Sequence, residues 1–383
     1  MRGRRDLSAV MANAGSARMK KIIFDKCYAF SGDAELEELL AESLDLYADA
    51  GDREPEVNVR IGRAVPAYKP SSINPRVHET FERGMLTSFP TVDVYWERAG
   101  DDRLEVDVVI KPRRGIRRTV HKLLSMEYPR EAEAFEQILH EFVLVPSVYF
   151  FKDVVPIHAA SVAIGGSACL LAGTGGAGKS SAMLALRDSE DVGFVSDDIV
   201  VMSDTARVNG NMAWPKIYGY NCVGNAMKSE ILAGRGWIDR AHFNIKNHVN
   251  SANVRRKMSP DRLYSRVESA SVPLSRLYYV VRENVPEICV SELDLANAVE
   301  MTIAVISAEY SIFHDHLYWE KYNALATGRP AMLTMEEVTA NWRRVLTTSL
   351  ATAGRFKISV PFEVDHAVYQ DSVTDIVVTG MAA

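Results

Sequence analysis

The sequence lacks the features that mark membrane proteins, disulfide-rich secreted proteins and nucleic-acid-binding proteins. No apolar run approaches the 18 residues of a membrane span. The net charge of −6 argues against non-specific binding to nucleic acid. The chain has four cysteines, and they are widely separated, with no CxxC pair. This scatter argues against a disulfide framework or a zinc site and favours a reducing compartment.

The first 19 residues lack the apolar core of a secretory signal, although three arginines precede a stretch of small residues. We interpret residues 1–19 as a flexible tail and expect a cytoplasmic protein with no membrane or nucleic-acid partner. The 383 residues, 47% of them hydrophobic, suffice for two domains with a large core.

Residues 20–130 predict an antiparallel, β-rich unit that carries one helix. Short alternating segments at 57–61, 92–96 and 104–110 are typical of strands separated by turn residues. Leucines at helical spacing predict an acidic helix over 33–50.

The remainder of the chain carries both helices and strands. An amphipathic helix is expected over 131–146, where Pro146 should end it. The other expected elements are strands at 192–195, 277–281 and 356–362 and helices at about 295–316 and 336–351.

Residues 173–180 match the phosphate-binding pattern GxxxxGK[ST]. Glycines let the backbone curl until successive N–H groups point into one concavity, where phosphate oxygens bind. Lys179 is then placed to reach the β- and γ-phosphates, and the Ser180 hydroxyl to bind Mg²⁺. An apolar segment precedes the motif and a helical stripe follows it, so strand, loop and helix come in the required order. The residues expected to bind the nucleotide are Gly173, Thr174, Gly175, Gly176, Ala177, Gly178, Lys179, Ser180 and Ser181.

Two aspartates follow an apolar strand downstream of this loop. A strand that ends in Asp beside a phosphate loop commonly supplies the second Mg²⁺ contact, here Asp197. The neighbouring carboxylate, Asp198, could accept a proton from an attacking hydroxyl. By themselves the two would be ordinary turn residues, but beside a phosphate loop the functional interpretation is favoured.

One histidine lies upstream of the loop, at the start of an apolar segment. His158 precedes a Gly165–Gly166 turn, which predicts a hairpin that returns the chain into the strand before the loop. A lone histidine in such a segment is usually a buried core residue.

The order of His-Ala-Ala, hairpin, GTGGAGKS and Asp-Asp resembles the HPr kinase/phosphorylase family and its HprK-like relatives. His158 precedes Lys179 by 21 positions, as in that family, and Asp198 follows Lys179 by 19 positions. The resemblance covers roughly residues 131–281. It implies an α/β fold whose P-loop kinase core, of the HPr kinase/PEP carboxykinase-like type, spans 131–383 with a C-terminal helical extension. Residues 20–130 would then be an N-terminal β-rich α+β accessory domain.

The resemblance also implies a role for each matching residue. Lys179 would bind and polarise the phosphates, Ser180 would hold Mg²⁺, and Asp198 would accept the proton of the substrate hydroxyl. His158 would support catalysis at the edge of the site. Asp197 is assigned to positioning the metal or a water molecule.

The family's later arginine-bearing glycine loop is not found in its usual form, and a basic segment stands at a similar distance. There, Arg255 or Arg256 could neutralise charge on the transferring phosphoryl group. An ordinary solvated basic turn is the alternative. Ser181 also replaces an acidic residue that often follows the Lys-Ser pair in the family.

The sequence thus predicts a kinase that uses ATP or GTP with Mg²⁺ to phosphorylate a hydroxyl, most simply that of a serine, in a peptide, small protein or metabolite. The resemblance favours a homo-oligomer. Two alternatives remain at this point, a nucleotide-binding regulatory module without phosphotransfer and a carboxykinase-like enzyme. The two histidines of the segment His314-Asp315-His316 do not predict a metal site, because positions i and i+2 of a helix face apart.

Overall fold

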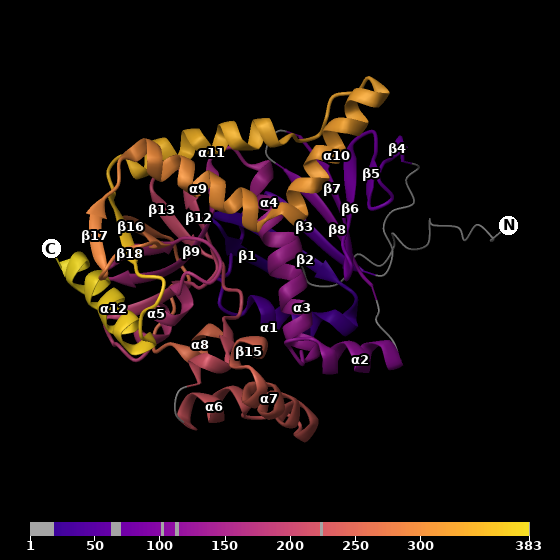
Figure 1. Ribbon diagram of the computed structural model, residues 1–383. Helices are drawn as coiled ribbons and strands as arrows, with labels where there is room; N and C mark the ends of the chain where they lie inside the picture. The colour runs from indigo at the N-terminus through magenta and orange to yellow at the C-terminus, as the bar shows by residue number, and fades with distance from the viewer. Residues whose placement is uncertain (1–18, 63–69, 101–102, 112–114, 223–224, 383) are drawn as a thin grey trace.

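The computed structural model describes residues 19–62, 70–100, 103–111, 115–222 and 225–382, and it shows a mixed α/β fold built on two large sheets (Figure 1). The predicted tail, 1–19, lies outside the described residues except for Met19, which begins the first strand. No helix in the described part combines the length and apolarity that a membrane crossing requires.

The first sheet has the strand order β1-β2-β3-β8-β7-β6-β5-β4. These strands are β1 (Met19–Ile23), β2 (Lys26–Gly32), β3 (Val57–Gly62), β4 (Ser72–Ile73), β5 (His78–Thr80), β6 (Gly84–Ser88), β7 (Val92–Arg98) and β8 (Leu104–Ile110). The predicted strands are confirmed, but the prediction of a wholly antiparallel unit is wrong. β3 runs parallel to both β2 and β8, because a helix crosses from β2 to β3 and the meander β4–β8 returns beside β3.

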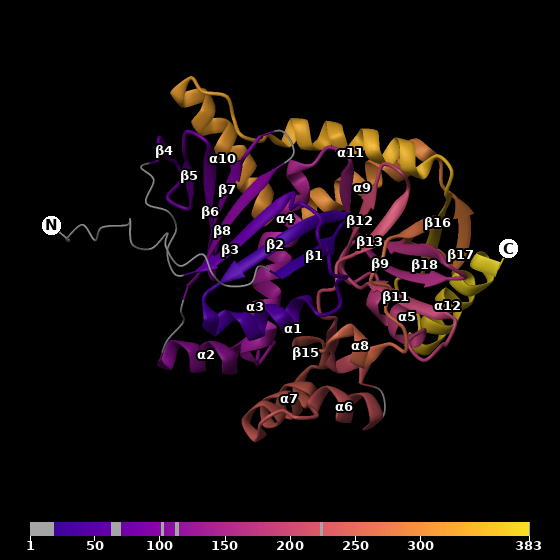
Figure 2. The same cartoon turned by 180° about the vertical axis from the view of Figure 1, so that it is seen from behind.

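Side chains alternate between the two faces of this first sheet. Val57, Val59 and Ile61 of β3 are buried, whereas Arg60 between them is exposed and pairs with Asp107 and Glu105 of β8. The buried face is covered by helices, and the opposite face turns away from them (Figure 2). The covering helices are α1 (Glu37–Leu44), α3 (Glu131–Leu139), α4 (Val145–Ser147) and α10 (Ser311–Thr327), and α2 (Ile116–Leu124) lies beside α3.

The second sheet contains the strand that leads into the glycine loop. Its order is β10-β9-β12-β13-β16-β18-β17, with β11 paired to β9 and β10 also paired to β16. The strands are β9 (Val154–Ile164), β10 (Ser167–Ala172), β11 (Val192–Ser196), β12 (Ile199–Ser203), β13 (Arg207–Gly210), β16 (Val272–Arg282), β17 (Cys289–Glu292) and β18 (Gly354–Val360). The β9–β10 hairpin is confirmed, with Gly165 and Gly166 both at positive φ in its turn.

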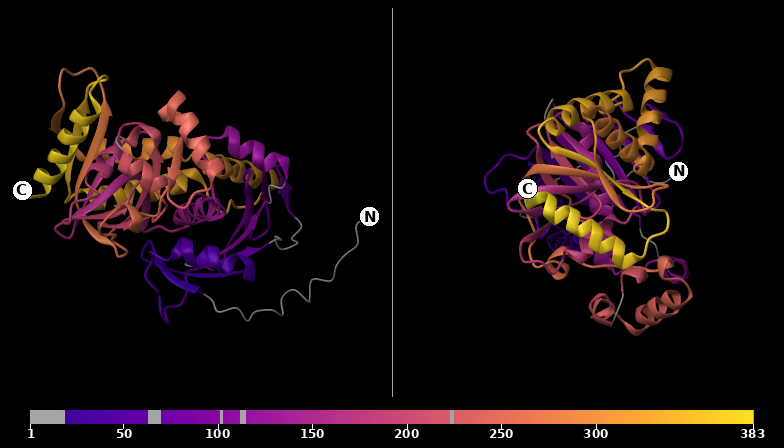
Figure 3. Two further views of the ribbon diagram at one scale, coloured as in Figure 1. Left: turned by 90° about the horizontal axis from the view of Figure 1, so that it is seen from below. Right: turned by 60° about the vertical axis from the view of Figure 1, so that its left-hand side comes forward.

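Helices cover both sides of this second sheet (Figures 1 and 3). Helices α9 (Leu295–Glu309) and α11 (Met335–Leu350) pack together against β9 on one side. Helices α5 (Lys179–Ala185) and α12 (His366–Ala382) pack together on the other. The layering places the loop between β10 and α5 at one edge of the sheet.

A helical lobe is inserted between β13 and β16 and projects from the body of the molecule (Figure 1). Its elements are β14 (Lys216–Tyr218), α6 (Asn225–Leu232), α7 (Trp237–Val249), β15 (Arg255–Lys257) and α8 (Pro260–Leu263). β14 and β15 form a short antiparallel ribbon at the base of the lobe.

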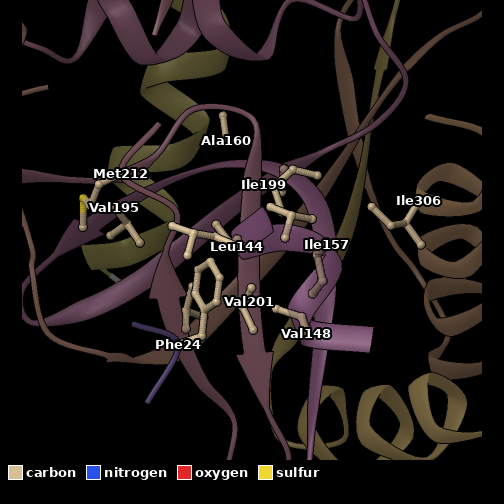
Figure 4. Packing of buried hydrophobic residues seen from close by; sticks show 14 of the residues in the cluster. Phe24, Leu144, Val148, Ile157, Ala160, Val195, Ile199, Val201, Met212 and Ile306 are labelled. Atoms are coloured by element: carbon tan, nitrogen blue, oxygen red, sulfur yellow. The ribbon is translucent and has the colours of Figure 1, made fainter. Parts of the chain in front are cut away.

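The two sheets share one hydrophobic core. Trp96 of β7 stacks on Phe150, 5.3 Å between ring centroids, and meets Phe313 of α10 edge-on at 5.8 Å. Phe24, in the turn between β1 and β2, lies beside Leu144, just before α4, and Val201 of β12 (Figure 4).

Three predicted helices have different bounds in the structure. The helix over 33–50 is α1 preceded by a 3₁₀ turn, and residues 48–50 instead lie beside β1, where the Ile22 nitrogen donates to the Ala48 carbonyl. Pro146 does not end the helix over 131–146. After α3 the chain continues as a π-helical stretch, His140–Leu144, and Pro146 falls in the first turn of α4, where no N–H is needed. The helix over 295–316 is broken at Tyr310 into α9 and α10.

Candidate functional site

The glycine loop joins β10 to α5, as the sequence predicts. Gly173, Gly176 and Gly178 have φ values of 144°, 78° and 107°, which a side chain would strain. The Lys179 side chain is buried and its Nζ donates to the carbonyl oxygens of Gly173 and Thr174, at 2.7 and 3.0 Å. Burial lowers the pKa of Lys179, and the negative charges of Asp198, Asp197 and Glu309 offset part of this decrease.

A carboxylate already binds a backbone N–H of this loop. The Gly175 nitrogen donates to Glu309 Oε1 at 2.7 Å. Glu309 is the last residue of α9, and the break at Tyr310 leaves its side chain beside the loop. A backbone N–H of the loop therefore donates to a negatively charged oxygen in this structure, as the N–H groups of a phosphate-binding loop must.

Asp197 follows β11 and lies next to Ser180. Its Oδ1 is buried without a hydrogen-bond partner. Burial raises the pKa of Asp197 to about 6, and a hydrogen bond from Ser180 offsets part of this rise. An orphaned buried carboxylate oxygen beside a hydroxyl is a donor set that suits Mg²⁺, which takes few protein ligands when phosphates supply the others. Within the described residues no three His, Cys, Asp or Glu side chains gather as a metal site.

His158 and Asp198 are brought together by adjacent strands. His158 of β9 is the register partner of Ile199 in β12, and its Nδ1 lies 3.4 Å from Asp198 Oδ1. Burial lowers the pKa of His158 even though Asp198 opposes the change, so the imidazole is neutral at pH 7. The Asp198 side chain is 48% exposed, which leaves its carboxylate accessible to a substrate.

A lysine that the sequence analysis did not single out lies beside Asp198. Lys216 Nζ lies 3.9 Å from Asp198 Oδ2 and 2.7 Å from Glu141 Oε1. Burial alone would raise the pKa of Asp198, but the charges of Lys216, His158 and Lys179 lower it below its ordinary value. Asp198 is therefore ionised at neutral pH.

The π-helical stretch helps to position this lysine. Glu141 lies within it and accepts from Lys216, while Glu136 one turn earlier accepts from Lys257 Nζ at 2.9 Å. Lys216 and Lys257 are register partners in the β14–β15 ribbon. Two carboxylates of one helical segment thus hold the ribbon against the site, and π-helical turns are frequent at functional sites.

The structure separates the two predicted arginines. Arg255 lies at the edge of the site, half-buried, where its Nη1 donates to the Tyr218 hydroxyl at 2.8 Å and its Nε pairs with Glu127. Arg256 is 1% exposed, and its guanidinium binds Asp239 and His242 inside the lobe. Neither arginine is in a solvated basic turn. The Arg256 side chain binds residues of the lobe and is not directed at the glycine loop.

Ser181 is buried behind the loop. Its hydroxyl accepts from Asn221 Nδ2 at 3.2 Å and its carbonyl accepts from Gln370 Nε2 at 2.9 Å. These bonds attach both the lobe and α12 to the helix that follows the glycine loop.

The sequence missed Glu309 and Lys216, for different reasons. Lys216 stands in an aromatic segment, 214–221, in which no motif marks the lysine, and no spacing links Glu309 to the loop. The two histidines do face apart, since His314 meets Tyr149 and His316 meets His78. No protein-family model and no curated protein matches this chain. The structure shows a mixed α/β fold. Because no known family or curated protein matches, the resemblance to HprK-like proteins remains a prediction.

Proposed function

We propose that this chain is an HprK-like phosphotransferase that moves the γ-phosphoryl group of ATP or GTP to a hydroxyl of a peptide, small protein or metabolite. The observation that carries the proposal is the convergence of three groups at one sheet edge. These are the glycine loop, Asp197 beside Ser180 with its buried Oδ1 atom, and the accessible Asp198 carboxylate 3.4 Å from His158.

The loop supports the binding step. The Gly175 backbone N–H already donates to the Glu309 carboxylate, and the phosphate chain would replace that carboxylate. Lys179 would exchange the carbonyls of Gly173 and Thr174 for phosphate oxygens. Ser180 and Asp197 would hold Mg²⁺, which when bound neutralises charge on the phosphates.

Asp198 supports the transfer step. As an ionised, accessible carboxylate it can accept the proton of an attacking hydroxyl. Neutral His158 would fix its orientation. Lys216 would offset the negative charge that the acceptor and the phosphates bring together. Catalysis of this kind depends chiefly on positioning and charge neutralisation.

The test compares the wild-type chain with Asp198→Asn, using γ-labelled ATP, Mg²⁺, serine-containing peptides and small hydroxyl compounds. We expect Asp198→Asn to lower the transfer rate about 10²- to 10⁴-fold, with the Kd for ATP unchanged. Asp204→Asn serves as the control, because Asp204 lies in the turn after β12, is half-buried and pairs with Arg344 at 3.8 Å. If both wild type and Asp198→Asn hydrolyse ATP equally and neither labels an acceptor, the kinase proposal is wrong.

A further inference from the structure

Three parallel strands end side by side at the edge of the sheet that carries the glycine loop. β10 pairs with β16 in parallel, Ala172 opposite Tyr279, and β16 pairs with β18 in parallel, Arg282 opposite Val360. Because parallel strands end at one edge, the loop after β18 lies on the same edge as the glycine loop. Ligands of α/β sheets bind at such edges.

A broadly open cavity of about 810 Å³ occupies this part of the edge. Gly176 of the glycine loop, Arg282 at the end of β16 and residues 362–365 after β18 line it. The cavity is therefore on the β16 and β18 side of the loop. His158 and Asp198 lie on the other side, where β9 and β12 are. Its volume is in the range of small-molecule sites.

The segment after β18 is held at both ends. Arg282 Nη1 donates to the Pro361 carbonyl at 3.0 Å, and its guanidinium lies 5.0 Å from the Tyr369 ring. Asp365 Oδ1 accepts from the Ala367 and Val368 nitrogens at the start of α12. Between these anchors the Phe362 side chain is 66% exposed.

The charges of the cavity favour an uncharged part of a ligand over a phosphate. Its lining has two carboxylates, Glu363 and Asp365, and one cation, Arg282, which already binds a carbonyl and an aromatic ring. An anion would be repelled by the carboxylates, whereas sugar hydroxyls can donate to them. An exposed aromatic ring offers a stacking face to any nucleobase.

We propose that this cavity binds the base and ribose of the nucleoside triphosphate, with the base stacked on Phe362 and the ribose hydroxyls donating to Glu363. The triphosphate would then pass Gly176 into the glycine loop, and its γ-phosphoryl group would lie on the Asp198 side. This inference rests on the proposed function, since it assigns a site to the base and ribose of the same nucleoside triphosphate whose phosphates the glycine loop would bind.

The test measures the Kd of the full-length chain, in Mg²⁺, for ATP and for inorganic tripolyphosphate, which has neither base nor ribose. Phe362→Ala is expected to weaken ATP binding about tenfold, the loss of one base–aromatic stacking contact, and to leave tripolyphosphate binding unchanged. Phe362→Trp, which restores a stacking face, is expected to restore ATP binding. Tyr322→Ala is the matched control, because Tyr322 is 54% exposed on α10, which packs on the first sheet.

The outcomes separate the two proposals. Equal ATP affinity of wild type and Phe362→Ala would overturn the base site and leave the proposed function in place. An equal loss of ATP and tripolyphosphate affinity would also overturn it, because the substitution would then act on the glycine loop. If wild type binds neither ligand, the proposed function fails and the base site fails with it.

Discussion

Glu309 of α9 accepts a hydrogen bond from the backbone nitrogen of Gly175, 134 residues away in the chain, at 2.7 Å. A carboxylate thus lies where the glycine loop would hold a phosphate oxygen. Both are anions that need the same N–H donor, so they compete.

We therefore expect Glu309→Ala to tighten binding of tripolyphosphate about fivefold, which corresponds to about 1 kcal/mol for one exposed hydrogen bond. Glu300→Ala on the same helix is the control, since Glu300 pairs with Arg343 away from the loop. Isothermal titration calorimetry measures the tripolyphosphate affinity of both variants. Weaker binding by Glu309→Ala would mean that this carboxylate assists the ligand instead of competing with it.

Asp197 is held in its ionised form at a cost to stability. Its pKa is about 6 in the folded chain, above the ordinary value of 3.8, so the folded state binds a proton more readily than the unfolded state. The destabilisation is absent below about pH 4 and complete above pH 6. We expect Asp197→Asn to raise the free energy of unfolding at pH 7.5 by about 1–3 kcal/mol while removing Mg²⁺-dependent nucleotide binding.

Urea unfolding at pH 7.5 and pH 4 checks the stability effect on Asp197→Asn, and calorimetry with and without Mg²⁺ checks binding. The gain in stability should shrink at the lower pH. An Asn variant that is less stable than wild type at pH 7.5 would contradict the assignment of this carboxylate as a strained metal ligand.

A buried histidine pair between β5 and α10 predicts sensitivity to acid. His78 Nδ1 lies 3.3 Å from His316 Nδ1, and His78 Nε2 lies 3.0 Å from Glu320 Oε2. Burial beside His78 lowers the pKa of His316 to about 3. The unfolded chain therefore binds the extra proton between about pH 6.5 and pH 3, and stability falls as the pH falls through that window, by up to about 1.4 kcal/mol per pH unit.

His316→Gln is expected to reduce this slope, measured as the free energy of unfolding in urea at pH 7.5, 6 and 5. His121→Gln, at an exposed histidine of α2, should show the same dependence of stability on pH as wild type. Identical slopes for the two variants would show that another group controls the acid response.

The sequence predicted those parts of the site that a local pattern encodes. The glycine loop, its strand and helix, and the Gly165–Gly166 hairpin depend on residues next to one another, and the structure has them all. The parallel placement of β3 could not be read, because alternation within a strand does not specify its neighbour. Glu309 and Lys216 reach the site through the break at Tyr310 and through the lobe ribbon, and both depend on packing over long chain separations.

Arg256 is the opposite case, a residue predicted for the site whose side chain is bound elsewhere. Its position within a basic segment suggested that it could neutralise charge on a phosphoryl group, yet its guanidinium binds Asp239 and His242 of α7. A sequence gives the charge of such a residue but not the partner that neutralises it.

The contact of α10 with β5 and β6 has a consequence for how this protein could be divided or recombined. The helix is encoded more than 200 residues after those strands, yet its Phe313 and the Trp96 ring of β7 pack together within the core. A fragment that ends before α10 would leave the part of the apolar face that α10 covers, around β5, β6 and Trp96, open to water. The first sheet is therefore not an exchangeable module, and any chimaera that keeps it must also keep the distant helix that covers it.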